Sequence, residues 1–193
     1  MKLKLALIAF LFAAGTAQAA DPVASGLPPG FSFSEYSGTT AVGDGLVNIS
    51  NVLFFIDEQT VAGIKSWYIF FEPLEAERVT ATITFDSPIV NVLDTKPALD
   101  GSNATYGIDV DGDGIFDDYT TSLLIAPEGR DVTTWTVGGL TLDWISLNPG
   151  DHIRVLTQAT VVPEPETWGL FAAGLAALGW RARRTSARRA ARR

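Results

Sequence analysis

The sequence predicts an all-β fold in residues 31–159, an antiparallel β-sandwich of jelly-roll or Greek-key type. Residues 79–85 alternate strictly between apolar side chains and threonines, which is typical of a half-buried antiparallel strand. The apolar face holds Val79, Ala81, Ile83 and Phe85, and the other face holds Thr80, Thr82 and Thr84. Short runs of this kind recur between turn residues, as in sandwiches, and apolar residues at helical spacing are scarce.

A hairpin is predicted over residues 132–145, where two short runs flank Gly138 and Gly139. Paired glycines allow the positive backbone angles that tight hairpin turns need. A loop of these two glycines would place Trp135 opposite Leu142, with every large apolar side chain on one face. The other face would hold Thr134, Thr136, Thr141 and Asp143.

The remaining elements of the domain follow from shorter patterns. Further strands are expected at residues 46–56, 66–71, 89–93, 120–125 and 153–159. Residues 148–151 (Asn-Pro-Gly-Asp) predict a turn, and residues 74–78 a single helical turn. Residues 20–30 form a loose segment leading into the domain, and residues 160–166 an extended linker.

The first 19 residues predict a signal peptide with an N-terminal signal helix. Lys2 and Lys4 precede an apolar run at residues 5–14, and Ala17 and Ala19 form a small-x-small cleavage site. The apolar run is too short for a permanent membrane span. Cleavage after Ala19 would produce an exported chain.

The body between the two terminal segments is strongly acidic. Residues 20–160 contain 20 acidic and 5 basic residues, a net charge of −15, whereas the whole chain carries −8. Such a body would repel nucleic acid and anionic lipid head groups and attract cations. The chain has no cysteine, so the fold cannot depend on disulfides.

A candidate Ca²⁺ site lies in residues 109–118, where oxygen donors alternate along the chain and Gly114 permits a sharp turn. Thr120 replaces the last glutamate of an EF-hand, and no helices are expected beside the loop, so an EF-hand is excluded. The predicted ligands are Asp109, Asp111, Asp113, the Ile115 carbonyl, Asp117 and, as a spare, Asp118.

This stretch resembles the Asp-x-Asp-Gly-Asp-Gly loops of extracellular calcium-binding repeats such as thrombospondin type 3 and integrin-type propeller blades. The resemblance implies one bound Ca²⁺. The alternative is a solvated acidic loop, although five carboxylates within ten residues repel one another without a counter-ion. We expect weak binding, about 10⁻⁴ to 10⁻³ M, that stabilises the domain.

The sequence lacks the residues that the common catalytic sites need, so we expect the protein not to be an enzyme. The only histidine, His152, stands beside a turn and is predicted to be solvated, which argues against a zinc hydrolase. A carboxylate pair for polysaccharide hydrolysis cannot be selected from so many acids. An aromatic run could form a sandwich core or the sugar-stacking face of a carbohydrate-binding module. Its members are Phe54, Phe55, Trp67, Tyr68, Phe70 and Phe71.

The last thirty residues combine three features. Pro163-Glu164-Pro165 precedes an apolar run at residues 167–180, and an arginine cluster fills residues 181–193. The run would form a helix of about 21 Å, short of the roughly 30 Å hydrocarbon core, which argues against a plain membrane anchor. The arginines should stay cytoplasmic, so the body would face outward.

This tail resembles the PEP-CTERM sorting domain of Gram-negative bacteria, through Pro163, Glu164, Pro165, the apolar helix, and Arg181, Arg183 and Arg184. The resemblance implies export by the general secretion machinery and recognition by an exosortase. It also implies transient residence in the inner membrane, then a place at the cell surface or in the matrix with exopolysaccharide and biofilm. We therefore expect a non-enzymatic structural or adhesive component that is stabilised by Ca²⁺, with extracellular polysaccharide as a candidate partner. A carbohydrate-binding module and a matrix polysaccharide hydrolase stay open as alternatives.

Overall fold

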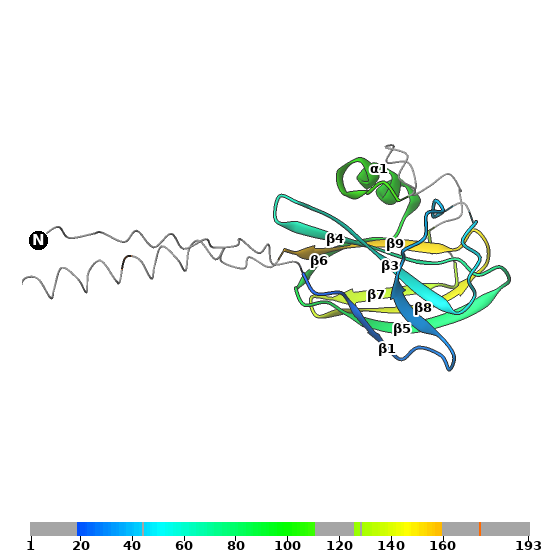
Figure 1. Cartoon of the computed structure of the whole chain (residues 1–193). Coiled ribbons are helices and arrows are strands. Elements are labelled where there is room, and N and C mark those ends of the chain that lie inside the picture. Colours follow the sequence, from blue (N-terminus) through cyan, green and yellow to red (C-terminus); the bar gives the residue numbers. More distant parts are fainter. Residues whose placement is uncertain (1–18, 44, 111–125, 128, 160–173, 175–193) are drawn as a thin grey trace, which may run out of the picture. The chain divides into compact units, whose positions relative to one another are not determined.

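The computed structural model of the chain describes residues 19–43, 45–110, 126, 127, 129–159 and 174. Apart from Gly174, these residues belong to one compact unit, Ala19–Thr160. Two β-sheets stack in this unit, and one helix of the described residues covers the outside of the second sheet (Figure 1). The predicted β-sandwich is confirmed. The expected signal helix and C-terminal helix lie outside the described residues, Gly174 excepted.

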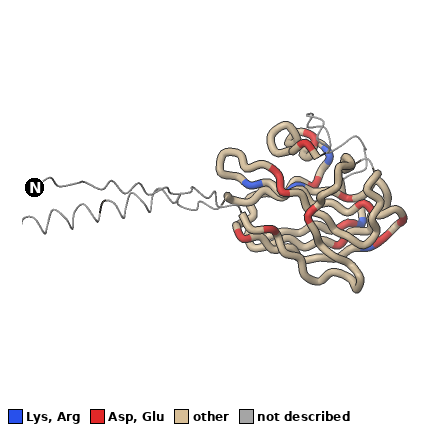
Figure 2. Tube along the Cα trace, viewed as in Figure 1, with Lys and Arg blue, Asp and Glu red and all other residues tan. Residues whose placement is uncertain are grey.

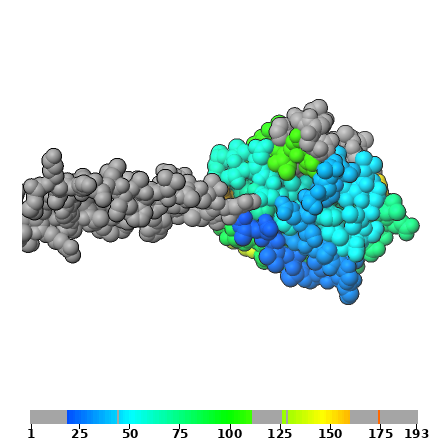
Figure 3. All heavy atoms as spheres, in the orientation of Figure 1, coloured from blue at the N-terminus to red at the C-terminus, as the bar shows by residue number. Residues whose placement is uncertain are grey.

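The first sheet is antiparallel throughout, with the strand order β1-β5-β8-β7. As predicted, β5 buries Val79, Ala81 and Ile83 and turns its threonines outward. β1 lies at one edge of this sheet, in the blue region of Figure 3. The four strands are β1 (Val23–Ser25), β5 (Glu77–Thr84), β8 (Gly139–Ser146) and β7 (Val132–Thr136).

The second sheet is mixed, with the strand order β2-β3-β4-β9-β6. β2 runs parallel to β3, which corrects the fully antiparallel expectation. The reason is that the connection at residues 36–51 carries the chain back to the end of the sheet where β2 begins. The jelly-roll or Greek-key type stays a prediction. The five strands are β2 (Ser32–Glu35), β3 (Val52–Val61), β4 (Ile64–Phe71), β9 (Asp151–Gln158) and β6 (Ile89–Leu93).

Most predicted strands are present, some with shifted ends. Residues 89–93 form β6 as expected, and β9 starts two residues before its expected position. The strand expected at residues 46–56 is β3, displaced toward the C-terminus because Ala62 and Gly63, with φ of 52° and 81°, make the turn into β4. The strand expected at residues 120–125 lies outside the described residues.

The β7–β8 hairpin has the predicted faces but a different register. Trp135 lies opposite Leu140 rather than Leu142, so the pairing is shifted by two residues. Gly139 is therefore part of β8 instead of the loop. A Cβ atom at Gly139 would come 3.1 Å from a backbone oxygen of β5, so the missing side chain lets the two strands lie close together.

Side chains between the sheets form the main core, which includes the fully buried Trp67 and Trp144. Trp67 faces inward together with Phe71. Tyr68 and Phe70 face the other way and join a second apolar cluster outside the second sheet. This division follows the predicted alternation, and the whole aromatic run is buried. The core interpretation of the run is therefore confirmed over a sugar-stacking face.

Helix α1 (Lys96–Tyr106) belongs to this second cluster through Leu99 and corrects the expectation that the domain holds no full helix. The helical turn expected at residues 74–78 is not formed. α1 contains Gly101, which has a low helix propensity, and buries only Leu99 and Ser102, whereas Pro97 stands in the first turn, where proline is tolerated. Contacts with the sheet, rather than an apolar stripe, must stabilise it.

Candidate functional site

Both ends of the folded unit lie beside the β5–β6 turn. The backbone N–H of Ala20 donates to Oδ2 of Asp86 at 3.0 Å. The N–H of Gln158 donates to the carbonyl oxygen of Pro88, also at 3.0 Å. The chain therefore enters and leaves the sandwich at the same end.

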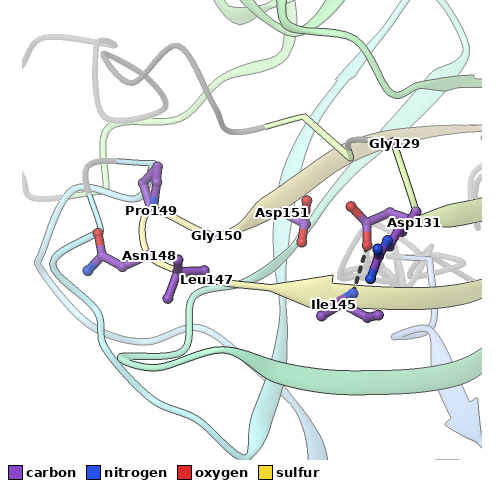
Figure 4. A pocket seen from close by; sticks show the side chains of 9 residues that line it. Gly129, Asp131, Ile145, Leu147, Asn148, Pro149, Gly150 and Asp151 are labelled. Carbon is purple, nitrogen blue, oxygen red and sulfur yellow. Dashed lines mark hydrogen bonds between the residues drawn. The ribbon is translucent and has the colours of Figure 1, made fainter.

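The opposite end of the sandwich carries a hollow of 410 Å³ (Figure 4). It lies at the start of β9, about 23 Å from the end of that strand at 3.3 Å per residue. The β8–β9 turn and the segment before β7 form it. The lining residues are Gly129, Arg130, Asp131, Ile145, Leu147, Asn148, Pro149, Gly150 and Asp151.

Aliphatic and charged side chains share the lining of this hollow. Ile145 and Leu147 are 47% and 58% exposed. Asp131 accepts a hydrogen bond from the backbone N–H of Ile145 at 2.7 Å, the dashed line in Figure 4, which ties the segment before β7 to β8. The hollow thus offers apolar contacts beside carboxylates.

The turn at this hollow, which the sequence predicted, is held by Asn148 and Gly150. Nδ2 of Asn148 donates to the carbonyl oxygen of Gly45 at 2.6 Å. Gly150 has a φ of 101°, and a Cβ atom there would come 2.5 Å from the backbone oxygen of Phe71. Only glycine fits this position.

The outer face of the first sheet is an array of hydroxyl groups. Because β5, β8 and β7 are neighbours, the two threonine faces predicted separately join into one surface. Cross-strand pairing places Ser25, Thr82, Thr141 and Thr134 in one row, with one residue from each strand. All four are exposed. Within the described part of the chain, the three threonine hydroxyls of this row bond to no protein group.

A second hollow, of 300 Å³, lies in this face around Gly139. Trp135, which is 42% exposed, contributes to its lining and is the one exposed aromatic residue of the described ranges. The other lining residues are Thr82, Thr84, Thr134, Thr136, Gly138 and Thr141.

One ion pair stands on the same face. Arg78 donates from Nε and Nη2 to the two carboxylate oxygens of Asp143, at 2.8 and 2.7 Å. These hydrogen bonds hold the pKa of Asp143 below its ordinary value and raise that of Arg78. The two charges cancel, so they add no net charge to the hydroxyl array.

A buried ion pair joins β9 to β3 beneath α1. Arg154 donates from Nε and Nη2 to Glu58, both at 2.8 Å, and neither side chain is exposed. Arg154 also donates to the carbonyl oxygen of Leu99 at 3.1 Å and to the side chains of Ser102 and Asn103, all on α1. Sequence reasoning missed this pair. The sequence feature that could have revealed it is an arginine inside the apolar run of β9, because a buried charge needs a partner of opposite charge.

His152 is completely buried, so the prediction of a solvated turn residue was wrong. Its Nε2 lies 3.3 Å from Glu72, and its ring stacks on Phe70 at a centroid distance of 5.4 Å. Glu72 also accepts the backbone N–H groups of Gly43 and Val47, at 2.6 and 3.2 Å. The prediction failed because β9 is buried on both faces, between the main core and the second cluster.

The predicted Ca²⁺ ligands lie outside the described residues, except for Asp109, which is half-buried and follows α1. Within the described ranges, no three His, Cys, Asp or Glu side chains are grouped so that they could hold a metal ion. Binding of Ca²⁺ at residues 109–118 stays a prediction.

The predicted sorting residues and Ala17 also lie outside the described residues, whereas Ala19 is the first residue described. Residues 161–184 match the family model of the PEP-CTERM protein-sorting motif. The chain carries a PEP-CTERM sorting motif. The motif indicates an exported protein that a membrane-associated exosortase processes for the cell surface, as the tail predicted. No curated protein and no solved structure matches the chain.

The PEP-CTERM motif begins at residue 161, directly after the compact unit that ends at Thr160. Among the described residues, no helix is long and apolar enough to cross a membrane. The run at residues 167–180 was predicted as the sorting helix, and of it only Gly174 is described.

Proposed function

We propose that the sandwich of this chain is a non-enzymatic structural or adhesive component of the cell surface or matrix, associated with exopolysaccharide and biofilm. The positions of the two ends of the folded unit, Ala20 and Gln158, are the main support for this proposal. The sorting motif follows the end of the sandwich where Ala20 and Gln158 lie. The 410 Å³ hollow lies at the other end, about 23 Å along β9.

The buried charges of the described residues support a role without catalysis. Arg154 and Glu58 hold α1 on the sheet. Glu72 accepts hydrogen bonds from the backbone N–H groups of Gly43 and Val47 and contacts His152. Acid–base catalysis needs such groups within reach of a substrate. Here they are engaged in packing.

Calcium stabilisation at residues 109–118 is part of the proposal and rests on the carboxylate spacing. The described part of the domain supports it in one respect, because Asp and Glu far outnumber Lys and Arg on it (Figure 2). An acidic domain concentrates divalent cations near its surface.

Surface labelling tests the delivery of the domain. The chain has no cysteine, so a single substitution provides a unique thiol. Leu147→Cys places this thiol on a side chain that is 58% exposed, at the end of the sandwich away from Ala20 and Gln158. A membrane-impermeant maleimide should label this variant on intact cells. Replacement of Pro163, Glu164 and Pro165 by alanine should confine labelling to lysed cells.

A matched control is Ala81→Cys, whose small side chain is only 3% exposed in the core. It should resist labelling in both preparations, which establishes that the delivered domain is folded. Equal labelling of intact cells with and without the Pro-Glu-Pro motif would contradict the proposal.

A further inference from the structure

We propose that the outer face of the first sheet binds a neutral polysaccharide. The polymer would lie across the strands along Ser25, Thr82, Thr141 and Thr134, with one sugar unit in the 300 Å³ hollow at Gly139. The inference deepens the proposed function, on which it rests for the presence of polysaccharide around the domain.

The spacing of the hydroxyl groups fits an extended polymer. Neighbouring strands lie about 4.8 Å apart, so the row of four residues spans about 14 Å. Thr84 and Thr136 stand in the next row, about 6.7 Å away along the strands. A threonine hydroxyl can donate one hydrogen bond and accept two, as a sugar hydroxyl can. The hydroxyls of Ser25 and Thr84 already donate to the carbonyl oxygens of Thr82 and Val23, at 3.4 and 3.3 Å, and offer acceptor positions only. The face thus presents matching groups in two dimensions.

The array is also rigid before binding. Threonine is β-branched and has restricted side-chain rotamers, and here the sheet fixes its backbone. The ordering of such side chains on binding costs less than the ordering of long flexible ones. Thr82, Thr134 and Thr141 need to release only water, because their hydroxyl groups bond to no protein group within the described ranges.

Charge favours a neutral ligand over an anionic one. Residues 20–160 carry a net charge of −15, which repels nucleic acids and acidic polymers. The two charged residues on this face, Arg78 and Asp143, neutralise each other. A polymer that carries hydroxyl groups and no charge meets no such repulsion here.

The composition of the face argues against a protein ligand. Protein interfaces are centred on large apolar or aromatic side chains in well-packed pockets. The centre of this face holds threonines and a glycine, and the exposed apolar side chains Val23, Val132 and Ile145 lie at its margins. Trp135 also borders the hollow at Gly139, but it pairs with Leu140 and therefore lies on the opposite side of β7 from Thr134 and Thr136, so it gives this face no aromatic centre.

Affinity electrophoresis of the purified full-length chain in mild detergent tests the inference. The probes are dextran, hydroxyethyl cellulose and galactomannan as neutral polymers, with alginate as the anionic one. At least one neutral polymer should retard the chain. Thr82→Val with Thr141→Val keeps the strand preference but removes two hydroxyls, and should weaken binding about 25-fold, at about fivefold for each hydrogen bond.

Two matched variants make the result specific. Thr60→Val with Thr105→Val changes two exposed threonines outside the face and should leave binding unchanged. Thr82→Ser with Thr141→Ser retains the hydroxyls and should bind like the unaltered chain. Because binding is measured on purified protein, it does not depend on delivery to the surface, which the labelling experiment measures separately.

Three results would overturn the inference. The first is that none of the three neutral polymers retards the chain. The second is that alginate alone does so, which would assign binding to charge. The third is equal weakening in the control variant Thr60→Val with Thr105→Val, which would place the bound polymer elsewhere.

Discussion

Replacing Arg154 with alanine removes the cation that neutralises Glu58 beneath α1. Both side chains are 0% exposed, so the carboxylate would stay buried without a partner. The loss of one member of a buried ion pair costs about 3–5 kcal/mol of unfolding free energy. With a typical urea slope of about 2 kcal/mol per M, the unfolding midpoint of the domain should fall by about 2 M. Circular dichroism in a urea series measures this shift.

The exposed pair formed by Arg78 and Asp143 provides the matched control. It is bidentate like the buried pair, but its side chains are 61% and 37% exposed, and exposed ion pairs contribute little to the free energy of unfolding. Arg78→Ala should leave the midpoint almost unchanged. The double variant Glu58→Leu with Arg154→Met should recover part of the loss, because no lone charge remains buried. Equal shifts for Arg154→Ala and Arg78→Ala would refute this reasoning.

Three further predictions concern two loops and the ion pair of Arg78 and Asp143. Glu72→Ala should lower the unfolding free energy by about 1–3 kcal/mol and speed hydrogen exchange at the amides of Gly43 and Val47, which donate hydrogen bonds to this carboxylate. Unchanged exchange at these two amides would show that Glu72 does not hold the loop. Asp111→Ala with Asp113→Ala should abolish the rise in melting temperature that Ca²⁺ gives, whereas equal melting of the unaltered domain in Ca²⁺ and in chelator would exclude the site. Arg78 lowers the pKa of Asp143, so their ion pair stabilises the fold above the ordinary Asp pKa and loses this effect as the pH falls. The difference in unfolding free energy between Arg78→Ala and the unaltered chain should therefore disappear at acidic pH, and an increase of this difference in acid would contradict the assignment.

The local patterns of the strands could be predicted, but their neighbours could not. The alternation of β5 placed Thr82 outward, and that of the β7–β8 hairpin placed Thr134 and Thr141 outward. Their union into one face depends on β5 pairing with β8, whose partner residues lie about 60 positions apart, as Thr82 and Thr141 do. Period-two patterns define faces and carry no information on sheet order.

The elements that sequence reasoning missed depend on long-range contacts. α1 has a weak intrinsic helix preference and is fixed by Arg154, which comes more than 50 residues later in the chain. His152 follows a turn, which suggested exposure, yet its strand lies between β4 and β6 in the sheet and is covered on both sides. In both cases tertiary packing overrides local preference.

Retention of the domain in the matrix is the decisive test of polysaccharide binding by the threonine face. A producing strain that lacks the chain would be complemented with the unaltered chain or with Thr82→Val and Thr141→Val, each carrying Leu147→Cys. We expect both forms to be labelled outside the cell, and only the unaltered form to stay in washed matrix and restore its cohesion. Equal retention of the two forms, or normal matrix cohesion without the chain, would contradict this expectation.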